Sequence, residues 1–306
     1  MTTVLTACEF NWDERNFCYN TRLNYTLHRS GTANEVLDYA HSMRYMLFNA
    51  DSVLLQVTDT TGAAVAHKDL DLPPGEYTMV TWSNLENSHH AEELIPGVTR
   101  MDKLHLDNSG NGANTEKLYF SSRTFTVKPG KQNTENIELT HSHALFHIIV
   151  KWTDFYPPIA DDWNLIMRNV PSRYSHLVGK RIEDYPQTNT RAESTSGKLI
   201  YTIPKTHGEN LSNHSTQAYN HPKGYVYGDF CTFRHTNDTH QLVSLWKGDE
   251  QQMKEIDLNK FFTTMNIDLD KNLRQEFNLT FTIKGSEVGV VLTEVSDWTD
   301  GGDLGD

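Results

Sequence analysis

Three histidines near the middle of the chain have side chains suited to metal chemistry. His141, His143 and His147 alternate with other residues in the run from His141 to Trp152, so a β-strand places all three on one face. Next neighbours on such a face are roughly 7 Å apart, and imidazole nitrogens are common metal ligands. A metal site also needs a carboxylate or groups that orient the histidines, and the sequence identifies neither. We therefore predict exposed or hydrogen-bonded histidines and no metal.

A second set of ligand types lies in one short polar stretch. His89, His90, Glu92 and Glu93 follow a strand-like run, without another ligand set at a recognisable spacing. A solvated loop explains these residues better than a metal site. The sequence thus predicts neither a metal nor another cofactor.

Cys8 ends the sequence Leu5-Thr6-Ala7-Cys8, which has the form of a bacterial lipobox. Signal peptidase needs small residues before the cut, and diacylglyceryl transfer needs a free thiol. Only seven residues precede Cys8, without a cationic start or a full apolar core, so we expect a truncated signal peptide. Acylation at Cys8, for example with palmitate, would attach the protein to a membrane without the chain crossing the bilayer. Each buried CH₂ group of the lipid contributes about 0.8 kcal/mol of binding free energy. A chance occurrence of these four residues is the alternative.

The other two cysteines, Cys18 and Cys231, form an even pair once Cys8 is set aside. An oxidising compartment permits a disulfide between them, provided that their Cα atoms lie within about 7 Å. Two unpaired thiols are the alternative.

Catalytic motifs are absent from the sequence. It contains no Gly-x-Ser-x-Gly, no phosphate-binding glycine loop, no His-Glu-x-x-His and no Cys-x-x-Cys. A glycosidase needs two carboxylates, but nothing selects two among 40 Asp and Glu residues. The net charge of −13 disfavours nucleic acid as a partner, because nucleic-acid-binding proteins carry basic patches. We predict a protein that is not an enzyme.

The elements that position these residues are short strands separated by turns, which predicts an all-β, antiparallel sandwich fold. At roughly 150 residues per domain, 306 residues suggest two domains. The clearest strands are Val53 to Asp59, followed by a turn at Gly62, and Tyr77 to Trp82, which follows the turn at Pro73-Pro74-Gly75. Tyr19 to Leu27 also alternates as a half-buried strand does.

These strands and turns carry a resemblance to a known family. Asp59 with Gly62, then Pro74-Gly75-Glu76-Tyr77, then Trp82-Ser83-Asn84 resemble the first domain of the FimB/Mfa-type fimbrillin anchor and tip proteins. These fimbrillin-A-associated anchor proteins are accessory lipoproteins of Bacteroidota fimbriae. Further similarities are the acidic residues after Cys8, which resemble a surface-export signal, a cysteine (Cys18) before the first strand, and a last strand followed by Trp298.

The resemblance implies two tandem transthyretin-like antiparallel β-sandwich domains. We expect a lipobox remnant and linker over 1–18, domains over 19–140 and 141–298, and a flexible acidic tail over 299–306. The implied protein is a surface-exposed lipoprotein of the cell outer membrane, which acts as anchor or tip subunit of a fimbria (pilus) assembled by β-strand complementation. Its implied partners are fimbrillin subunits, outer-membrane lipid held through Cys8, and host or bacterial surface ligands in cell adhesion, but no nucleic acid.

Strand complementation makes Tyr19 to Leu27 and Glu287 to Val295 the segments to examine. Cleavage before the first strand would detach a lipid at Cys8, so we expect this protein to keep that strand. The alternative function is a glycan-binding β-sandwich surface lipoprotein of a polysaccharide-uptake locus. Exposed tryptophans would then stack on sugars, whereas core packing is the other explanation for them; the six are Trp12, Trp82, Trp152, Trp163, Trp246 and Trp298.

Overall fold

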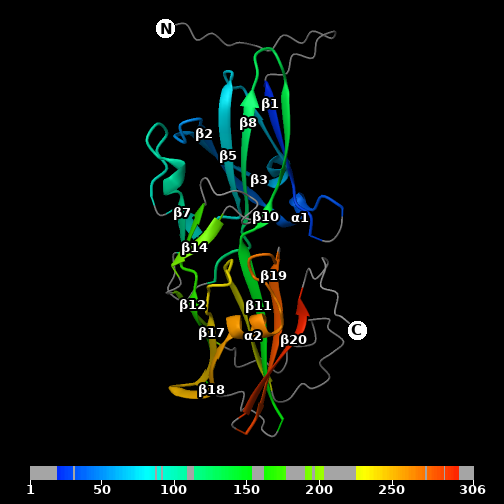
Figure 1. Cartoon of the computed structure of the whole chain (residues 1–306), viewed down its shortest axis with the longest axis vertical. Helices are drawn as coiled ribbons and strands as arrows, with labels where there is room; N and C mark the ends of the chain where they lie inside the picture. Colours follow the sequence, from blue (N-terminus) through cyan, green and yellow to red (C-terminus); the bar gives the residue numbers. More distant parts are fainter. Residues whose placement is uncertain are drawn as a thin grey trace. The chain divides into compact units, whose positions relative to one another are not determined.

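The computed structural model divides the chain into two compact units made mostly of β-strands (Figure 1). Unit 1 contains residues up to Asn84, 94–101 and 120–139, and unit 2 contains 85–93, 102–119 and the chain from Thr140 on. The prediction of an all-β fold is confirmed. The residues that the structure describes are 19–29, 32–86, 88–90, 92–108, 114–153, 162–176, 190–194, 197–202, 225–272, 274–285 and 287–295.

Unit 1 is a sandwich of two sheets. One sheet has the order β4-β1-β9, and in the other β8, β5, β2 and β3 are successive neighbours. The sheets face each other, since the hydroxyl groups of Tyr25 and Thr81 are 2.9 Å apart and the rings of Tyr25 and Tyr45 are 5.4 Å apart. The strands are β1 (Thr21–Thr26), β2 (Ser42–Asn49), β3 (Leu54–Thr61), β4 (His67–Leu70), β5 (Gly75–Ser83), β8 (Tyr119–Val127) and β9 (Asn133–Glu138).

Strand β1 lies in the middle of its sheet. It pairs with β4 in antiparallel and with β9 in parallel orientation. Alternate side chains of β1 are buried, including Leu23 and Tyr25, as the period-two pattern predicts. The parallel pair departs from the purely antiparallel sandwich that we expected.

Local contacts explain the motif residues around β5. The hydroxyl of Tyr77 donates to the carbonyl of Pro73 at 2.9 Å, which closes the corner before the strand. Trp82 is buried against Phe120, with ring centroids 4.6 Å apart. At the end of β5, Asn84 adopts a positive φ of 60°, a conformation that asparagine tolerates better than most residues. Its side chain accepts a hydrogen bond from the His41 amide at 3.0 Å and donates one to the Tyr39 carbonyl at 2.8 Å.

Unit 2 contains a second sandwich. Its sheets have the orders β16-β11-β19-β20 and β15-β12-β17-β18, and one hydrophobic core lies between them. β11 and β19 pair in parallel, whereas the pairs β11–β16, β19–β20, β12–β15, β12–β17 and β17–β18 are antiparallel. The strands are β11 (His143–Trp152), β12 (Trp163–Val170), β15 (Gly197–Thr202), β16 (Tyr225–Phe233), β17 (Leu242–Lys247), β18 (Glu250–Asp257), β19 (Gln275–Lys284) and β20 (Glu287–Val295).

A third sheet in unit 2 uses chain from before Thr140. Its order is β14-β13-β7-β6, formed by β6 (Ser88–His90), β7 (His105–Asn108), β13 (Arg173–His176) and β14 (Thr190–Ser194). β7 pairs with β13, and Arg173 donates two hydrogen bonds to Asp107, at 2.7 and 2.9 Å. Residues 85–93 and 102–119 thus belong to unit 2, although they precede the domain boundary that we expected at residue 140. The expected domains, 19–140 and 141–298, stay a prediction. The short strand β10 (Thr140–His141) leads into β11. The remaining short elements are three helical turns: α1 (Val36–Tyr39), η1 (Gly62–Ala66) and η2 (Met101–Lys103).

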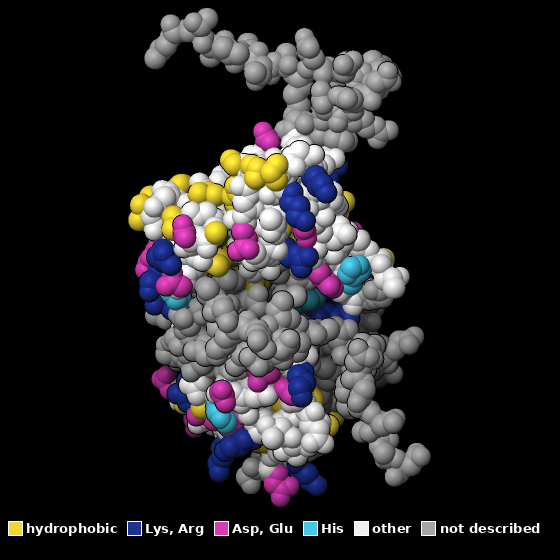
Figure 2. Space-filling view, turned by 45° about the horizontal axis from the view of Figure 1, so that its top comes forward, with side chains coloured by type: hydrophobic (Ala, Val, Ile, Leu, Met, Phe, Trp, Pro, Cys, Tyr) yellow, Lys and Arg dark blue, Asp and Glu magenta, His cyan; other side chains and the backbone are white. Residues whose placement is uncertain are grey.

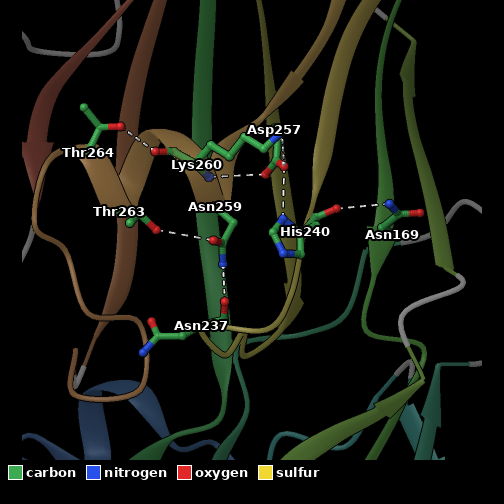
Figure 3. A network of polar contacts seen from close by, with 8 residues as sticks. All are labelled: Asn169, Asn237, His240, Asp257, Asn259, Lys260, Thr263 and Thr264. Atoms are coloured by element: carbon green, nitrogen blue, oxygen red, sulfur yellow. Dashed lines mark hydrogen bonds and ion pairs between the residues drawn. The ribbon is translucent and has the colours of Figure 1, made fainter.

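Helix α2 (Leu258–Thr264) is fixed to the neighbouring loop by polar side chains (Figure 3). Asp257 caps the helix by accepting from the Lys260 amide, and its other oxygen lies 3.0 Å from Nδ1 of His240. The amide of Asn259 donates to the Asn237 carbonyl at 2.6 Å. The helix also buries Phe262 against Phe277, so these contacts close one part of the unit 2 core.

We expect Asn84→Ala to lower the stability of unit 1 by about 3 kcal/mol. Alanine adopts a positive φ poorly, and the change removes two hydrogen bonds at a buried position. Denaturant unfolding followed by tryptophan fluorescence measures the loss. Asn136→Ala is the control, because Asn136 is exposed and its side chain accepts a hydrogen bond from the Asn24 side chain at the surface. Equal effects of the two changes would contradict this account of Asn84.

Candidate functional site

One face of the sheet that contains β16, β11 and β19 gathers polar side chains. Leu145 of β11 lies between Cys231 of β16 and Glu276 of β19, and His147 lies between Asp229 and Asn278. Successive side chains of a strand point to opposite faces, so these residues share the face directed away from the core. The intervening residues, such as Phe146 and Phe277, belong to the core.

A cavity of about 340 Å³ opens on this face. His147 and Asp229 are hydrogen-bonded to each other, and Lys117 adds a cationic group. The size falls in the range of small-molecule pockets. Its lining residues are Asn114, Lys117, Leu145, Phe146, His147, Asp229, Phe230, Cys231, Glu276, Phe277 and Asn278.

Cys231 places a thiol, a potential nucleophile, in the lining of the cavity. The surroundings of this thiol keep it protonated. Burial raises the pKa of the Cys231 thiol to about 12. The thiol donates to the Glu116 carbonyl at 3.4 Å and accepts from the Thr115 hydroxyl at 3.5 Å. A thiol with so high a pKa is unreactive at neutral pH. Cys8 and Cys18 lie outside the described residues, so lipidation and the Cys18–Cys231 disulfide stay predictions.

Beside this face lies a buried cluster of aromatic and ionisable residues. His141 and His143 are only 5% and 1% exposed, and the ring of Tyr119 packs edge-on against both, at 5.0 and 5.3 Å. Nδ1 of His143 is 2.7 Å from the Leu118 carbonyl. One ligand atom each from His141, His143 and Glu276 can be chosen so that all three lie within 4.8 Å of one another.

This cluster differs from the set of three histidines that the sequence analysis considered as metal ligands and rejected. His141 and His143 come together, but His147 pairs with Asp229 instead. Glu276 takes the third place because the parallel pairing of β11 and β19 brings it beside Leu145. Sequence reasoning missed Glu276, since its only local signal is an alternating strand pattern that does not reveal the pairing partner.

Buried polar contacts fix the residue next to Glu276. The Gln275 side chain accepts from the His235 amide at 2.7 Å and donates to the carbonyls of His235 and Leu269, at 2.7 and 2.8 Å. Arg234 also donates to the Leu269 carbonyl, at 3.2 Å. The start of β19, and with it the Glu276 backbone, is therefore held in place.

His235 is a fully buried titratable group of this network. The Thr232 hydroxyl donates to the Phe233 carbonyl, so Nε2 of His235 must be the donor to that hydroxyl, at 2.8 Å. Burial, aided by the positive charge of Arg234, lowers the pKa of His235 to about 3. His235 is thus neutral in the folded protein at neutral pH.

The remaining ligand types of the sequence analysis lie elsewhere. His89 and His90 belong to β6, which pairs with β7, so this part is a short strand rather than the loop that we expected. Glu92 and Glu93 are exposed, in accord with a solvated position.

The described tryptophans do not form an exposed row. Trp82 and Trp163 are buried, whereas Trp152 and Trp246 are half-buried. Trp152 packs edge-on against Trp163 at 5.4 Å. Core packing therefore accounts for these side chains better than sugar stacking does; Trp12 and Trp298 lie outside the described residues.

The surface in Figure 2 has basic and acidic side chains interspersed over its described part, rather than one continuous basic patch. This distribution agrees with the negative net charge. Within the described residues, no helix has the length and apolar character needed to cross a membrane.

A sequence profile of the fimbrillin-A associated anchor proteins Mfa1 and Mfa2 matches residues 8–299. The chain belongs to this family. A comparison with curated protein sequences returned no match. Membership in the Mfa1/Mfa2 anchor family supports a fimbrial accessory or adhesion role, with cell-surface association and other fimbrial subunits as partners.

Solved structures show the same fold at low sequence identity. A candidate polysaccharide-binding protein from Bacteroides thetaiotaomicron gives a TM-score of 0.67 at 14% identity and covers 89% of this chain and 95% of its own. A candidate adhesin from Bacteroides ovatus gives 0.65 at 16% identity, with coverages of 92% and 95%. The fimbrial anchor protein Mfa2 from Porphyromonas gingivalis gives 0.56 at 13% identity, with coverages of 89% and 94%. The family is one of structural anchors, and the absence of enzymatic activity in this member stays a prediction.

Folding stability should fall in acid partly because of His235. Its pKa is about 3 when folded and about 6.5 when unfolded, so only the unfolded state gains the proton as the pH falls below 6.5. At pH 5 this difference costs about 2 kcal/mol. We expect His235→Gln to lose less stability than the wild type between pH 7.5 and pH 5, as measured by denaturant midpoints.

The control for this experiment is His240→Gln, because His240 is exposed and its Nδ1 contacts Asp257 at the surface. We expect it to keep the wild-type pH dependence of stability. An unchanged pH dependence in His235→Gln would contradict this account, because it would show that the pKa of His235 is the same in the folded and unfolded states.

Proposed function

We propose that this member of the anchor family is a surface-exposed outer-membrane lipoprotein that anchors or tips a fimbria built by β-strand complementation. Cys8 carries the lipid, fimbrillin subunits are the partners, and adhesion to host or bacterial surface ligands is part of the role. The proposed layout is a linker over 1–18, domains over 19–140 and 141–298, and an acidic tail over 299–306. The proposal leaves Cys18 and Cys231 either bridged by a disulfide or as two unpaired thiols.

The observation that carries this proposal is the different placement of the first and last strands. β20 is at the end of its sheet and pairs with β19, whereas β1 is enclosed by β4 and β9. An edge strand offers backbone N–H and C=O groups to which another strand can add. In β20, Val288 and Val290 are half-buried, whereas Val291 is 54% exposed. This edge is where we place the contact with another subunit.

The position of β1 supports its retention in the mature protein. Its removal would break two ladders at once and uncover the core around Leu23 and Tyr25. Cleavage between Cys8 and β1 would also separate the protein from its lipid. A strand that is both central and downstream of the lipid suits an anchor better than a subunit that sheds its first strand.

Lipidation is tested by labelled-palmitate incorporation in cells that express the gene with its native upstream DNA. We expect label in the wild type, none in Cys8→Ala, and release of that variant from the membrane fraction. Cys18→Ala is the control and should keep the label, since only the lipobox cysteine is acylated. An unlabelled wild-type protein would refute the lipoprotein assignment.

The edge assignment is tested by Val291→Lys, because a charged lysine on an edge opposes the addition of another strand. We expect several-fold less fimbrial subunit to co-purify with this variant than with the wild type. Val98→Lys is the control, since Val98 is also exposed, at 68%, but lies in unit 1. Unchanged co-purification with Val291→Lys would exclude this edge as the contact.

A further inference from the structure

We propose that unit 2 binds one zinc ion through His141, His143 and Glu276. The ligand set consists of two imidazoles and one carboxylate, a combination that suits zinc and related transition metals. Calcium and magnesium prefer sites made of oxygen atoms. Three protein ligands leave the fourth position of a tetrahedral ion for water.

The hydrogen bond of His143 prepares its ring for a metal. A carbonyl oxygen only accepts, so Nδ1 of His143 carries the proton that it donates to Leu118 at 2.7 Å. In the neutral ring, Nε2 then holds the lone pair that a metal needs. Metal-binding histidines commonly have such a second partner, which fixes both the tautomer and the ring orientation.

The spacing requires a modest contraction. Zinc bonds of about 2.0–2.1 Å place tetrahedral ligands about 3.3 Å apart, compared with the upper limit of 4.8 Å found here. His141 and His143 are buried and packed against Tyr119, so they have little freedom. Glu276 is half-buried and has a long side chain, so its carboxylate is the ligand with the most freedom to move toward an ion.

Glu276 also connects the cluster to solvent. It lines the cavity of about 340 Å³ on the outer face of the sheet, whereas the two histidines are buried and do not line it. An ion can therefore reach the carboxylate through the cavity, and the cavity can hold the water that completes the coordination. The bound ion would link β10 and β11 to β19.

The test uses the purified full chain without a histidine tag, treated with EDTA and dialysed. Zinc chloride is then added, bound zinc is measured by elemental analysis after gel filtration, and the melting temperature is recorded. We expect one zinc per chain and a melting temperature that is higher by about 5 °C when free zinc is 100 times the dissociation constant. Magnesium and calcium at the same concentration should leave the melting temperature unchanged.

Two variants separate this site from zinc held by surface histidines. Glu276→Gln keeps the side-chain size but removes the charged ligand, and we expect at least tenfold weaker zinc binding with little change in the metal-free melting temperature. His147→Asn is the control and should bind zinc as the wild type does, because His147 pairs with Asp229 outside the cluster. The proposal is wrong if the wild type retains no zinc, if Glu276→Gln retains it equally well, or if His147→Asn loses it.

Discussion

The parallel ladder between β11 and β19 runs from Ala144↔Gln275 to Trp152↔Ile283. The core of unit 2, its cluster of histidines with Glu276, and its edge strand all depend on this pairing. Parallel neighbours need a long crossover connection, and here the chain forms the opposite sheet and α2 before it returns as β19. The ladder buries Phe146 beside Phe277 on the core side. On the other side it brings Glu276 near His143 and leaves β20 at the edge of the sheet.

Unit 1 repeats this arrangement with different strands. Its first strand, β1, pairs in parallel with β9, its last strand, so the beginning and the end of the unit lie side by side. Contacts between residues so far apart in sequence cost loop-closure entropy before they contribute stability, which predicts slow folding. In the folded unit, however, β1 has a partner on each side and cannot leave without opening the core.

The sequence predicted the features that depend on residues near one another in the chain, namely strand faces and turns. The alternation in Tyr19 to Leu27 identified the buried face of β1, and the prolines with Tyr77 identified the corner before β5. It could not predict the pairing of β7 with β13 or of β11 with β19, because strand patterns do not encode the partner. For this reason the sequence analysis considered His141, His143 and His147 together, found no carboxylate partner for them, and did not identify Glu276.

The two proposals for unit 2 concern strands that differ in how firmly they are held. A metal at His141, His143 and Glu276 would strengthen the connection between β11 and β19, which are interior strands. β20 is held by an antiparallel ladder to β19 that has an irregularity between Asn278 and Leu279, and it contributes no ligand. Local opening free energies vary within one protein, and an edge strand with exposed side chains lies at the low end. A metal that reinforces β11 and β19 would leave β20 free to rearrange. The subunit could then exchange its contacts with other subunits at this edge while its core stays folded.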